Sequence, residues 1–140
     1  MSAPERATLA LLAAAALHLG FQLTVTALVY PALSRVSTAD WALAHRRHSR
    51  AIVPLVVVTY GALVLAGGWA LATTASPWVL VAVAGAGLSL LTTALVAAPT
   101  HGRLSAGKDP ALVRRLLHAD YARSAGAVLC LVGAALAALR

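Results

Sequence analysis

The chain has 140 residues, of which 61% are hydrophobic and only 11% charged, and its formal net charge is +7. Soluble domains contain roughly 25% charged residues, so this composition excludes an ordinary soluble domain. The basic residues flank apolar segments, which is typical of membrane topology signals and binding to anionic lipid headgroups rather than of nucleic-acid binding. The length suits one domain over residues 1–140, with the lipid bilayer as its surroundings.

Four apolar segments predict an all-α protein, an integral membrane bundle of four transmembrane helices. The predicted spans cover about residues 7–33, 51–73, 77–98 and 121–139. Each has roughly the 20 residues that a helix needs to cross a bilayer. Pro31 and Pro99 are expected to end the first and third spans, because proline cannot continue the hydrogen bonding of a helix.

A short amphipathic helix is expected before the second span. Ser37 and Asp40 have the spacing of a capping box, which indicates a helix from Thr38 to about Arg50. Pro54 lies near the start of the second span and favours a kink there.

The positive charges are distributed unevenly between the two sides of the predicted bundle. Only Arg6 and Arg140 lie on the side of the termini, whereas the other Lys and Arg residues follow the first and third spans. By the positive-inside rule, we expect both termini outside and both long loops in the cytoplasm of a bacterial-type inner or plasma membrane.

One stripe of polar residues runs along the first span. His18, Gln22 and Thr26 are spaced at i, i+4 and i+8, which places them on one helical face. An ionisable ring inside hydrocarbon is costly, so His18 is a candidate catalytic residue, with Gln22 positioning it. Tyr60 of the second span is a third catalytic candidate, through its hydroxyl group. The alternative is structural: hydrogen bonds between helices for the stripe, and packing for Tyr60.

The other histidines predict a metal site on the loop side of the bundle. His45 and His48 share a helical face at i, i+3, and His101 follows the third span on the same side. We expect these three as metal ligands, with His18 as a further ligand or a substrate contact. Imidazole ligands without thiolate or carboxylate favour copper, with iron, haem and zinc as alternatives. The competing interpretation is that these histidines are simply solvated at a headgroup-facing surface.

The last helix carries a second group of polar residues where it enters the membrane. Asp120 either orients a ligating imidazole or pairs with Arg123 at i, i+3, and we favour the pairing. His118 lies in a strongly basic turn, so it is the histidine least expected to take part in a site.

Three short runs carry a resemblance to a broad group of small four-helix bacterial membrane proteins. The runs are Leu17-His18, Pro31-Ala32-Leu33 and His48-Ser49-Arg50-Ala51. The group includes the anthrone-oxygenase-like and the copper-resistance protein D-like families, and His18 matches a first-helix histidine found in parts of it. Resemblance to the first family implies oxygenation of aromatic polyketides, and resemblance to the second implies copper handling.

The expected function is a membrane-embedded, metal-dependent oxidoreductase, an oxygenase or oxidase. It would act on a hydrophobic or aromatic small molecule through a histidine-lined site in the cytoplasmic half of the bundle. The alternative is a non-catalytic copper- or haem-binding or transport protein. A third reading is an assembly protein with incidental histidines, and the Ala-rich surface suits homo-oligomerisation.

Overall fold

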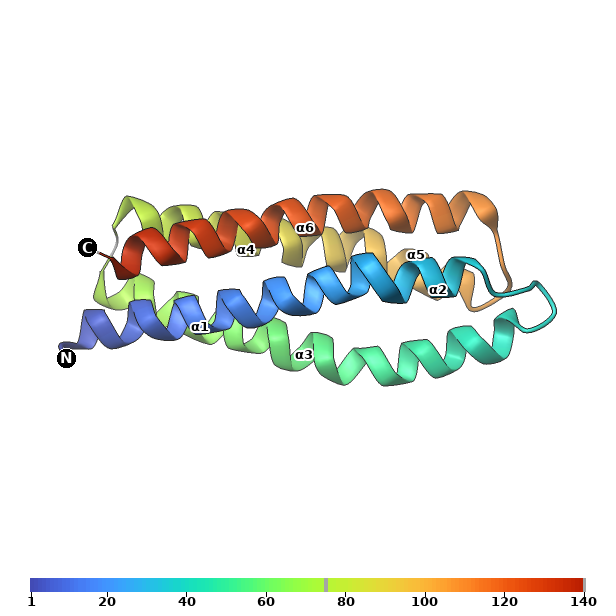
Figure 1. Cartoon of the computed structure of the whole chain (residues 1–140), viewed down its shortest axis with the longest axis horizontal. Helices are drawn as coiled ribbons and strands as arrows, with labels where there is room; N and C mark the ends of the chain where they lie inside the picture. The colour runs from blue at the N-terminus through green and yellow to red at the C-terminus, as the bar shows by residue number, and fades with distance from the viewer. Residues whose placement is uncertain (75, 140) are drawn as a thin grey trace.

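Four long apolar helical runs lie side by side as a bundle in the computed structural model, which describes residues 1–74 and 76–139 (Figure 1). The runs are Ala3–Ser34, Trp41–Thr73, Pro77–Leu104 and Pro110–Ala138. Each of these four runs is long and apolar enough to cross a bilayer. The predicted all-α bundle of four spans is therefore confirmed, and the chain is a multi-pass membrane protein with four candidate spans.

Two of the runs contain a wide π-helical turn, and neither ends at its proline. The first run is α1 (Ala3–Thr24), the π-helix η1 (Val25–Val29) and α2 (Tyr30–Ser34). The third is α4 (Pro77–Thr92), η2 (Thr93–Ala97) and α5 (Ala98–Leu104). Both π-helices contain the sequence Thr-Ala-Leu-Val, and Pro31 or Pro99 follows shortly after. Because a proline ring crowds the preceding turn and lacks an N–H, the wider turn lets the helix continue through it.

The expected amphipathic helix before the second span does not exist as a separate element. Its residues form the first part of α3 (Trp41–Thr73), a single helix that contains Pro54. Ser37 instead closes a turn, because its hydroxyl oxygen accepts a hydrogen bond from the Asp40 N–H at 3.1 Å. The prediction was wrong because no helix-breaking residue lies between Arg50 and Ala51, so the helix continues into the second span. Pro54, further on, removes only one backbone hydrogen bond, a loss that a transmembrane helix tolerates.

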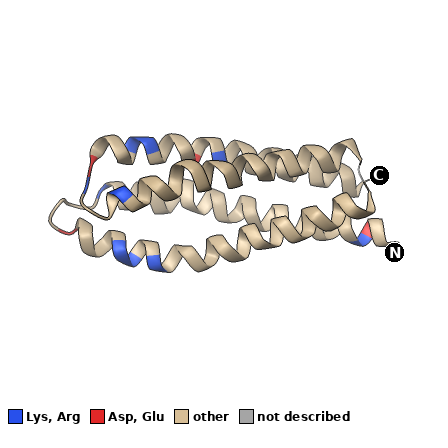
Figure 2. Ribbon diagram, turned by 180° about the vertical axis from the view of Figure 1, so that it is seen from behind, with Lys and Arg blue, Asp and Glu red and all other residues tan. Residues whose placement is uncertain are grey.

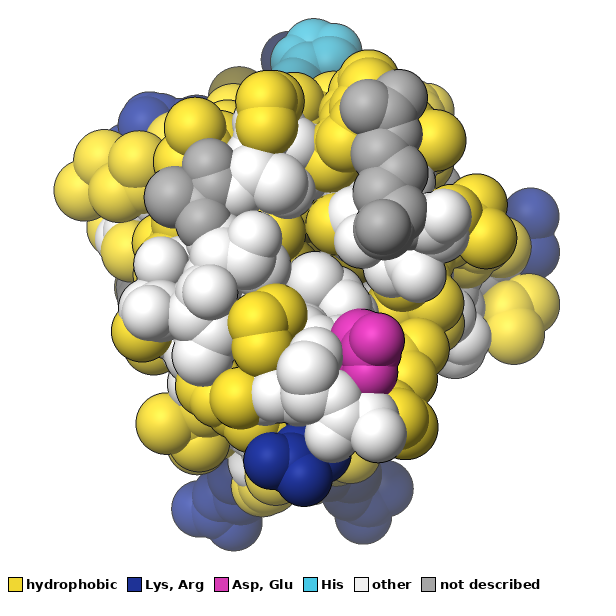
Figure 3. Space-filling view, turned by 90° about the vertical axis from the view of Figure 1, so that its left-hand side faces the viewer, with side chains coloured by type: hydrophobic (Ala, Val, Ile, Leu, Met, Phe, Trp, Pro, Cys, Tyr) yellow, Lys and Arg dark blue, Asp and Glu magenta, His cyan; other side chains and the backbone are white. Residues whose placement is uncertain are grey.

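The two ends of the bundle differ in charge. Both termini lie at one end with the turn between α3 and α4, which we call the terminal end (Figure 1). The other end, the loop end, carries the loops between α2 and α3 and between α5 and α6 (Pro110–Ala138). Most Lys and Arg residues gather towards the loop end (Figure 2), whereas the face at the terminal end is mostly apolar or uncharged (Figure 3).

Helices α4 and α6 form the closest pair of the bundle. A Cβ atom added at Gly85 would lie 2.5 Å from the Cys130 backbone nitrogen, and one added at Gly133 would lie 2.5 Å from that of Ala82. The Ser89 hydroxyl donates to the Arg123 carbonyl at 2.8 Å across the same interface. Small residues allow this backbone contact, as in many transmembrane helix pairs. Helix α3 packs mainly on α1 and contacts α4 much less.

Candidate functional site

Three histidines from two helices meet in the half of the bundle next to the loop end. His45 and His48 come from α3 and His101 from α5, and we call them the histidine cluster. His45 Nε2 lies 3.2 Å from His101 Nδ1, and the centroids of these rings are 5.4 Å apart. The His48 and His101 ring centroids are 5.5 Å apart. The structure therefore brings together the three side chains that the sequence placed on one side of the membrane.

Trp41 covers the histidine cluster on the side of the loop end. Its ring stacks on His45 with a centroid distance of 5.3 Å, and its indole N–H donates to the Leu104 carbonyl at 2.8 Å. The Lys108 ammonium lies 5.7 Å from the Trp41 ring centroid. Trp41 is 1% exposed and His45 is 3% exposed, so Trp41 shields the His45 ring, whereas His48 and His101 are half-buried.

We expect the substitution Trp41→Phe to lower the free energy of unfolding by about 1 kcal/mol, because the Leu104 carbonyl loses the indole donor and keeps only the weaker bond from the Gly107 N–H at 3.3 Å. Unfolding in mixed detergent micelles, followed by circular dichroism, measures this change. The matched control is Trp69→Phe on the exposed part of α3. An equal effect of the two substitutions would contradict the role assigned to Trp41.

The nitrogens of the histidine cluster partly meet the requirements of a metal site. At 3.2 Å, the His45 and His101 nitrogens form a hydrogen bond, with the donor set by the tautomer. Two imidazole nitrogens bound tetrahedrally to one ion at about 2.0–2.1 Å would lie roughly 3.3 Å apart, so an ion can replace the shared proton with little movement of the rings. His48 Nε2 is buried and has no hydrogen-bond partner in the described part of the chain. However, residues 1–74 and 76–139 contain no group of three or more His, Cys, Asp or Glu side chains already placed to hold a metal. Two ligands thus have a suitable spacing, and a third imidazole lies beside them.

A buried chain of hydrogen bonds connects the histidine cluster with the first helix. The Tyr30 hydroxyl lies 3.4 Å from His101 Nε2, and the Arg123 guanidinium donates to that hydroxyl at 3.0 Å. The same guanidinium donates to Asp120 at 2.6 Å, and this carboxylate also accepts from Gln22 Nε2 at 2.6 Å. Four helical runs thus contribute to one polar network, consistent with the rule that intramembrane polar groups face the bundle interior.

The ion pair of this network is almost completely buried. The side chains of Asp120 and Arg123 are 2% and 6% exposed. Their contact at 2.6 Å confirms the predicted i, i+3 pairing. Paired charges avoid most of the penalty of an isolated charge in a low-dielectric interior. The contacts of this pair with Gln22 and Tyr30 were not predicted, because hydropathy and spacing do not reveal which faces of separate helices meet.

His18 belongs to a different part of the interior. It is fully buried, its ring centroid lies 5.0 Å from that of Tyr60, and neither ring nitrogen has a hydrogen-bond partner within the described residues. His18 precedes Tyr30 by 12 residues, about 18 Å of helix at 1.5 Å per residue. This distance is too long for His18 to share a metal ion with the histidine cluster. Its predicted catalytic role, and those of Gln22 and Tyr60, stay predictions.

A cavity of about 210 Å³ adjoins the histidine cluster, and we call it the loop-half cavity. It lies between the first helical run, α3 and the η2–α5 part of the third run, and its polar lining includes Tyr30, His101 and Arg123. Apolar side chains such as Phe21 and Ile52 form most of the remaining wall. An apolar cavity with a few polar groups at one side is typical of sites that bind small hydrophobic molecules.

The sequence analysis anticipated neither the contacts of Tyr30 and Trp41 at this site nor the hydrogen bond from Arg123 to Tyr30. The Tyr30-Pro31 and Asp120-to-Arg123 spacings are visible in the sequence, but neither one indicates a shared partner. Comparison with known proteins found no matching family model, curated protein or solved structure. The chain is a four-helix protein with four long apolar helices.

Proposed function

We propose that the protein is a membrane-embedded oxidoreductase, an oxygenase or oxidase, that acts on a hydrophobic or aromatic small molecule. The observation that supports this proposal is the position of His101. Its Nδ1 lies 3.2 Å from His45 Nε2, and the same side chain lines the loop-half cavity. A metal held by His45 and His101, with His48 as the third ligand, would therefore adjoin a cavity that suits an apolar substrate.

Copper is the metal that we propose, with iron or haem as alternatives, because the proposed ligands are imidazoles. Zinc fits the same ligands but has no redox chemistry, so it would suit only a non-redox role. A bound redox metal would supply electron transfer between the substrate and dioxygen. The protein side chains would bind and orient the substrate. Tyr30 and Arg123 line the cavity and carry hydrogen-bond donors, and Arg123 Nε is buried without a partner in the described chain. These donors suit a carbonyl or phenolic oxygen.

The remaining predicted residues act at a distance from the cavity in this proposal. Gln22 donates to Asp120, which holds the Arg123 guanidinium, so Gln22 and Asp120 are positioning residues. His18 contacts the ring of Tyr60, whose hydroxyl bonds to Thr93, a residue of the cavity wall. The apolar surroundings keep water out, and fixed donors are most effective in such a dry environment.

We place the loop end in the cytoplasm, with both termini outside. The excess of Lys and Arg towards that end supports this orientation through the positive-inside rule (Figure 2). The cavity then lies in the cytoplasmic half of the membrane, where a hydrophobic substrate can reach it from the bilayer.

A non-catalytic copper- or haem-binding protein is the second candidate. The burial of His45, which is 3% exposed under Trp41, favours it because a shielded site holds an ion without needing access for a substrate. Oxygen consumption that depends on an added aromatic substrate separates the two candidates. Metal binding without such turnover would support the second.

The proposed function predicts a metal that depends on the histidine cluster. We expect detergent-purified protein to contain stoichiometric copper or iron by elemental analysis, and the combined change of His45, His48 and His101 to Ala to remove it. The control is His118→Ala, because His118 is exposed on α6 and should leave the metal content unchanged. Wild-type protein that binds no copper, iron, zinc or haem after reconstitution would contradict the proposal.

A further inference from the structure

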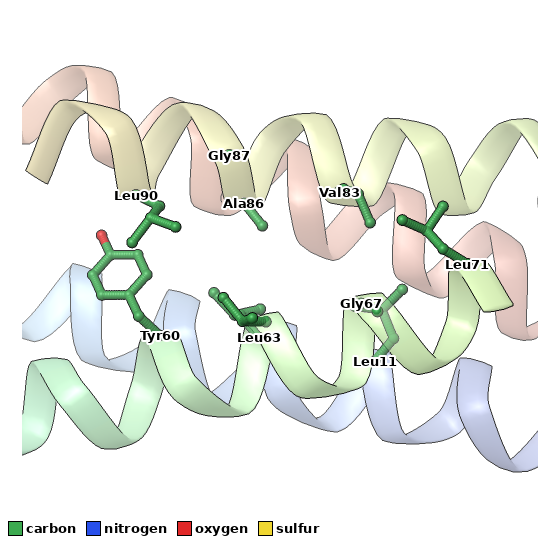
Figure 4. Close-up of a pocket in the computed structure, with 11 residues that line it drawn as sticks. Leu11, Tyr60, Leu63, Gly67, Leu71, Val83, Ala86, Gly87 and Leu90 are labelled. Atoms are coloured by element: carbon green, nitrogen blue, oxygen red, sulfur yellow. The ribbon is translucent and has the colours of Figure 1, made fainter. Parts of the chain in front are cut away.

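A second cavity lies further along the same side of the bundle, in the half next to the terminal end. It has a volume of about 280 Å³ and lies between α3 and α4, with α1 behind it (Figure 4). We call it the terminal-half cavity. Its lining is apolar except for Tyr60, and includes Leu63 and Gly67 of α3 and Ala86 and Gly87 of α4.

The two cavities follow one another along a single interface between helices. The lining residues of α3 begin at Ser49 and recur at helical spacing as far as Leu71, about 33 Å of helix at 1.5 Å per residue. This length is similar to the hydrocarbon thickness of a bilayer, about 30 Å. Tyr60 lines one cavity and Thr93 the other, and their hydroxyls are 2.8 Å apart. We call the two cavities together the groove.

We propose that the groove binds one neutral phenol or quinone that carries a single long alkyl or isoprenoid chain. The aromatic ring occupies the loop-half cavity, and the chain extends along the terminal-half cavity. This inference rests on the proposed function, because it names the class of substrate that the oxidoreductase would take.

The volumes favour one ligand that occupies both cavities. At about 210 and 280 Å³, each cavity is smaller than the roughly 300–1,000 Å³ that is typical of small-molecule sites. Together they fall within that range. The Tyr60–Thr93 hydrogen bond divides the groove at one place, which suits a ring on one side and a thin chain on the other.

The side chains at the loop-half cavity favour a neutral aromatic ring. Phe21, Tyr30 and His101 contribute aromatic rings to its wall, and aromatic pairs are stabilised by stacked or edge-to-face contacts. Arg123 is the one charged residue among the described lining residues of both cavities, and its charge is balanced by Asp120. The groove therefore offers hydrogen-bond donors without a net positive charge, which disfavours the phosphate of a phospholipid headgroup.

Gly87 lines the terminal-half cavity and provides a way to test the proposal. A Cβ atom added at Gly87 would have nothing within 4 Å, so a side chain placed there starts without a clash between its Cβ atom and a neighbouring helix. Gly61 of α3 also has open space around its Cβ position but lines neither cavity. Gly61→Leu is therefore a matched control for Gly87→Leu.

The test measures binding to the full-length protein in phosphatidylcholine nanodiscs by quenching of tryptophan fluorescence. The probes are menadione, a naphthoquinone without a chain, and phylloquinone, a related ring with one phytyl chain. Phytol, the chain alone, is tested by its ability to displace phylloquinone. We expect Gly87→Leu to raise the Kd for phylloquinone about ten-fold, because the leucine overpacks the part of the groove that holds the chain. The Kd for menadione should stay unchanged. Gly61→Leu should change neither value.

Equal effects of Gly87→Leu and Gly61→Leu on phylloquinone would overturn the proposal. Phytol that displaces phylloquinone at equal concentration would also overturn it, because the groove would then bind any lipid chain. If wild-type protein binds metal but neither quinone, this inference fails and the proposed function stands. If phylloquinone binds in the expected way but no metal does, the groove is supported and the metal-dependent function fails.

Discussion

The substitution Asp120→Asn should lower the free energy of unfolding by about 3 kcal/mol, because it leaves the Arg123 guanidinium buried without a counter-charge. The asparagine has almost the same shape as the aspartate, so the change tests charge rather than packing. Asp120 is the acceptor for both Arg123 and Gln22, each at 2.6 Å, and the Arg123 side chain is only 6% exposed. Reversible unfolding in mixed micelles of sodium dodecyl sulfate and dodecyl maltoside measures the loss.

A double-mutant cycle identifies the ion pair as the cause. The combined change Asp120→Asn and Arg123→Met removes both charges, and we expect it to cost less than the sum of the single changes. Arg115→Ala, at an exposed position of the same helix, should stay within about 0.5 kcal/mol of the wild type. An Asp120→Asn protein as stable as the wild type would show that the pair is not buried in the way that the structure shows.

The substitution Gly85→Ala should destabilise the bundle by about 3 kcal/mol, at the upper end of the range for overpacking. Its Cβ atom would lie 2.5 Å from the Cys130 nitrogen and 2.6 Å from the Gly126 carbonyl oxygen, and both are backbone atoms. A flexible side chain can turn away from such a contact, but a helix backbone cannot. Helices α4 and α6 would have to move apart along the interface. The same unfolding experiment measures the effect.

Gly87 gives the matched control on the same helix. A Cβ atom there has nothing within 4 Å, so Gly87→Ala should stabilise the protein by about 0.5–1 kcal/mol through reduced backbone entropy of the unfolded chain. The two alanine substitutions are therefore expected to change stability in opposite directions. Equal stability of the two variants would contradict the backbone contact between α4 and α6.

The sequence was sufficient to predict the four spans because the hydropathy of a span depends only on consecutive residues. It was also sufficient to group His45, His48 and His101. Successive spans cross the membrane in opposite directions, so the start of the second span and the end of the third lie on the same side. The contact between Gln22 and Asp120 could not be predicted in this way. These residues are 98 positions apart, and the side on which two helices meet depends on packing that hydropathy does not encode.

Two errors have a common physical origin in proline. Pro31 and Pro99 were expected to end spans, whereas Pro54 was expected only to kink the second span. In the structure all three lie inside continuous helical runs. A proline inside a helix costs the free energy of one backbone hydrogen bond. Neighbouring helices can compensate for this loss, so a transmembrane helix can continue past its proline.

The π-helices η1 and η2 set the direction in which later side chains point. A π-helical turn holds one residue more than the neighbouring α-helical turns, so it is equivalent to a single-residue insertion. One residue corresponds to about 100° of rotation in an α-helix with 3.6 residues per turn. Tyr30 directly follows η1, and His101 lies just beyond η2. Without these extra residues each side chain would be rotated by about that angle from its present direction, so the 3.4 Å contact between Tyr30 and His101 depends on two one-residue insertions in otherwise ordinary helices.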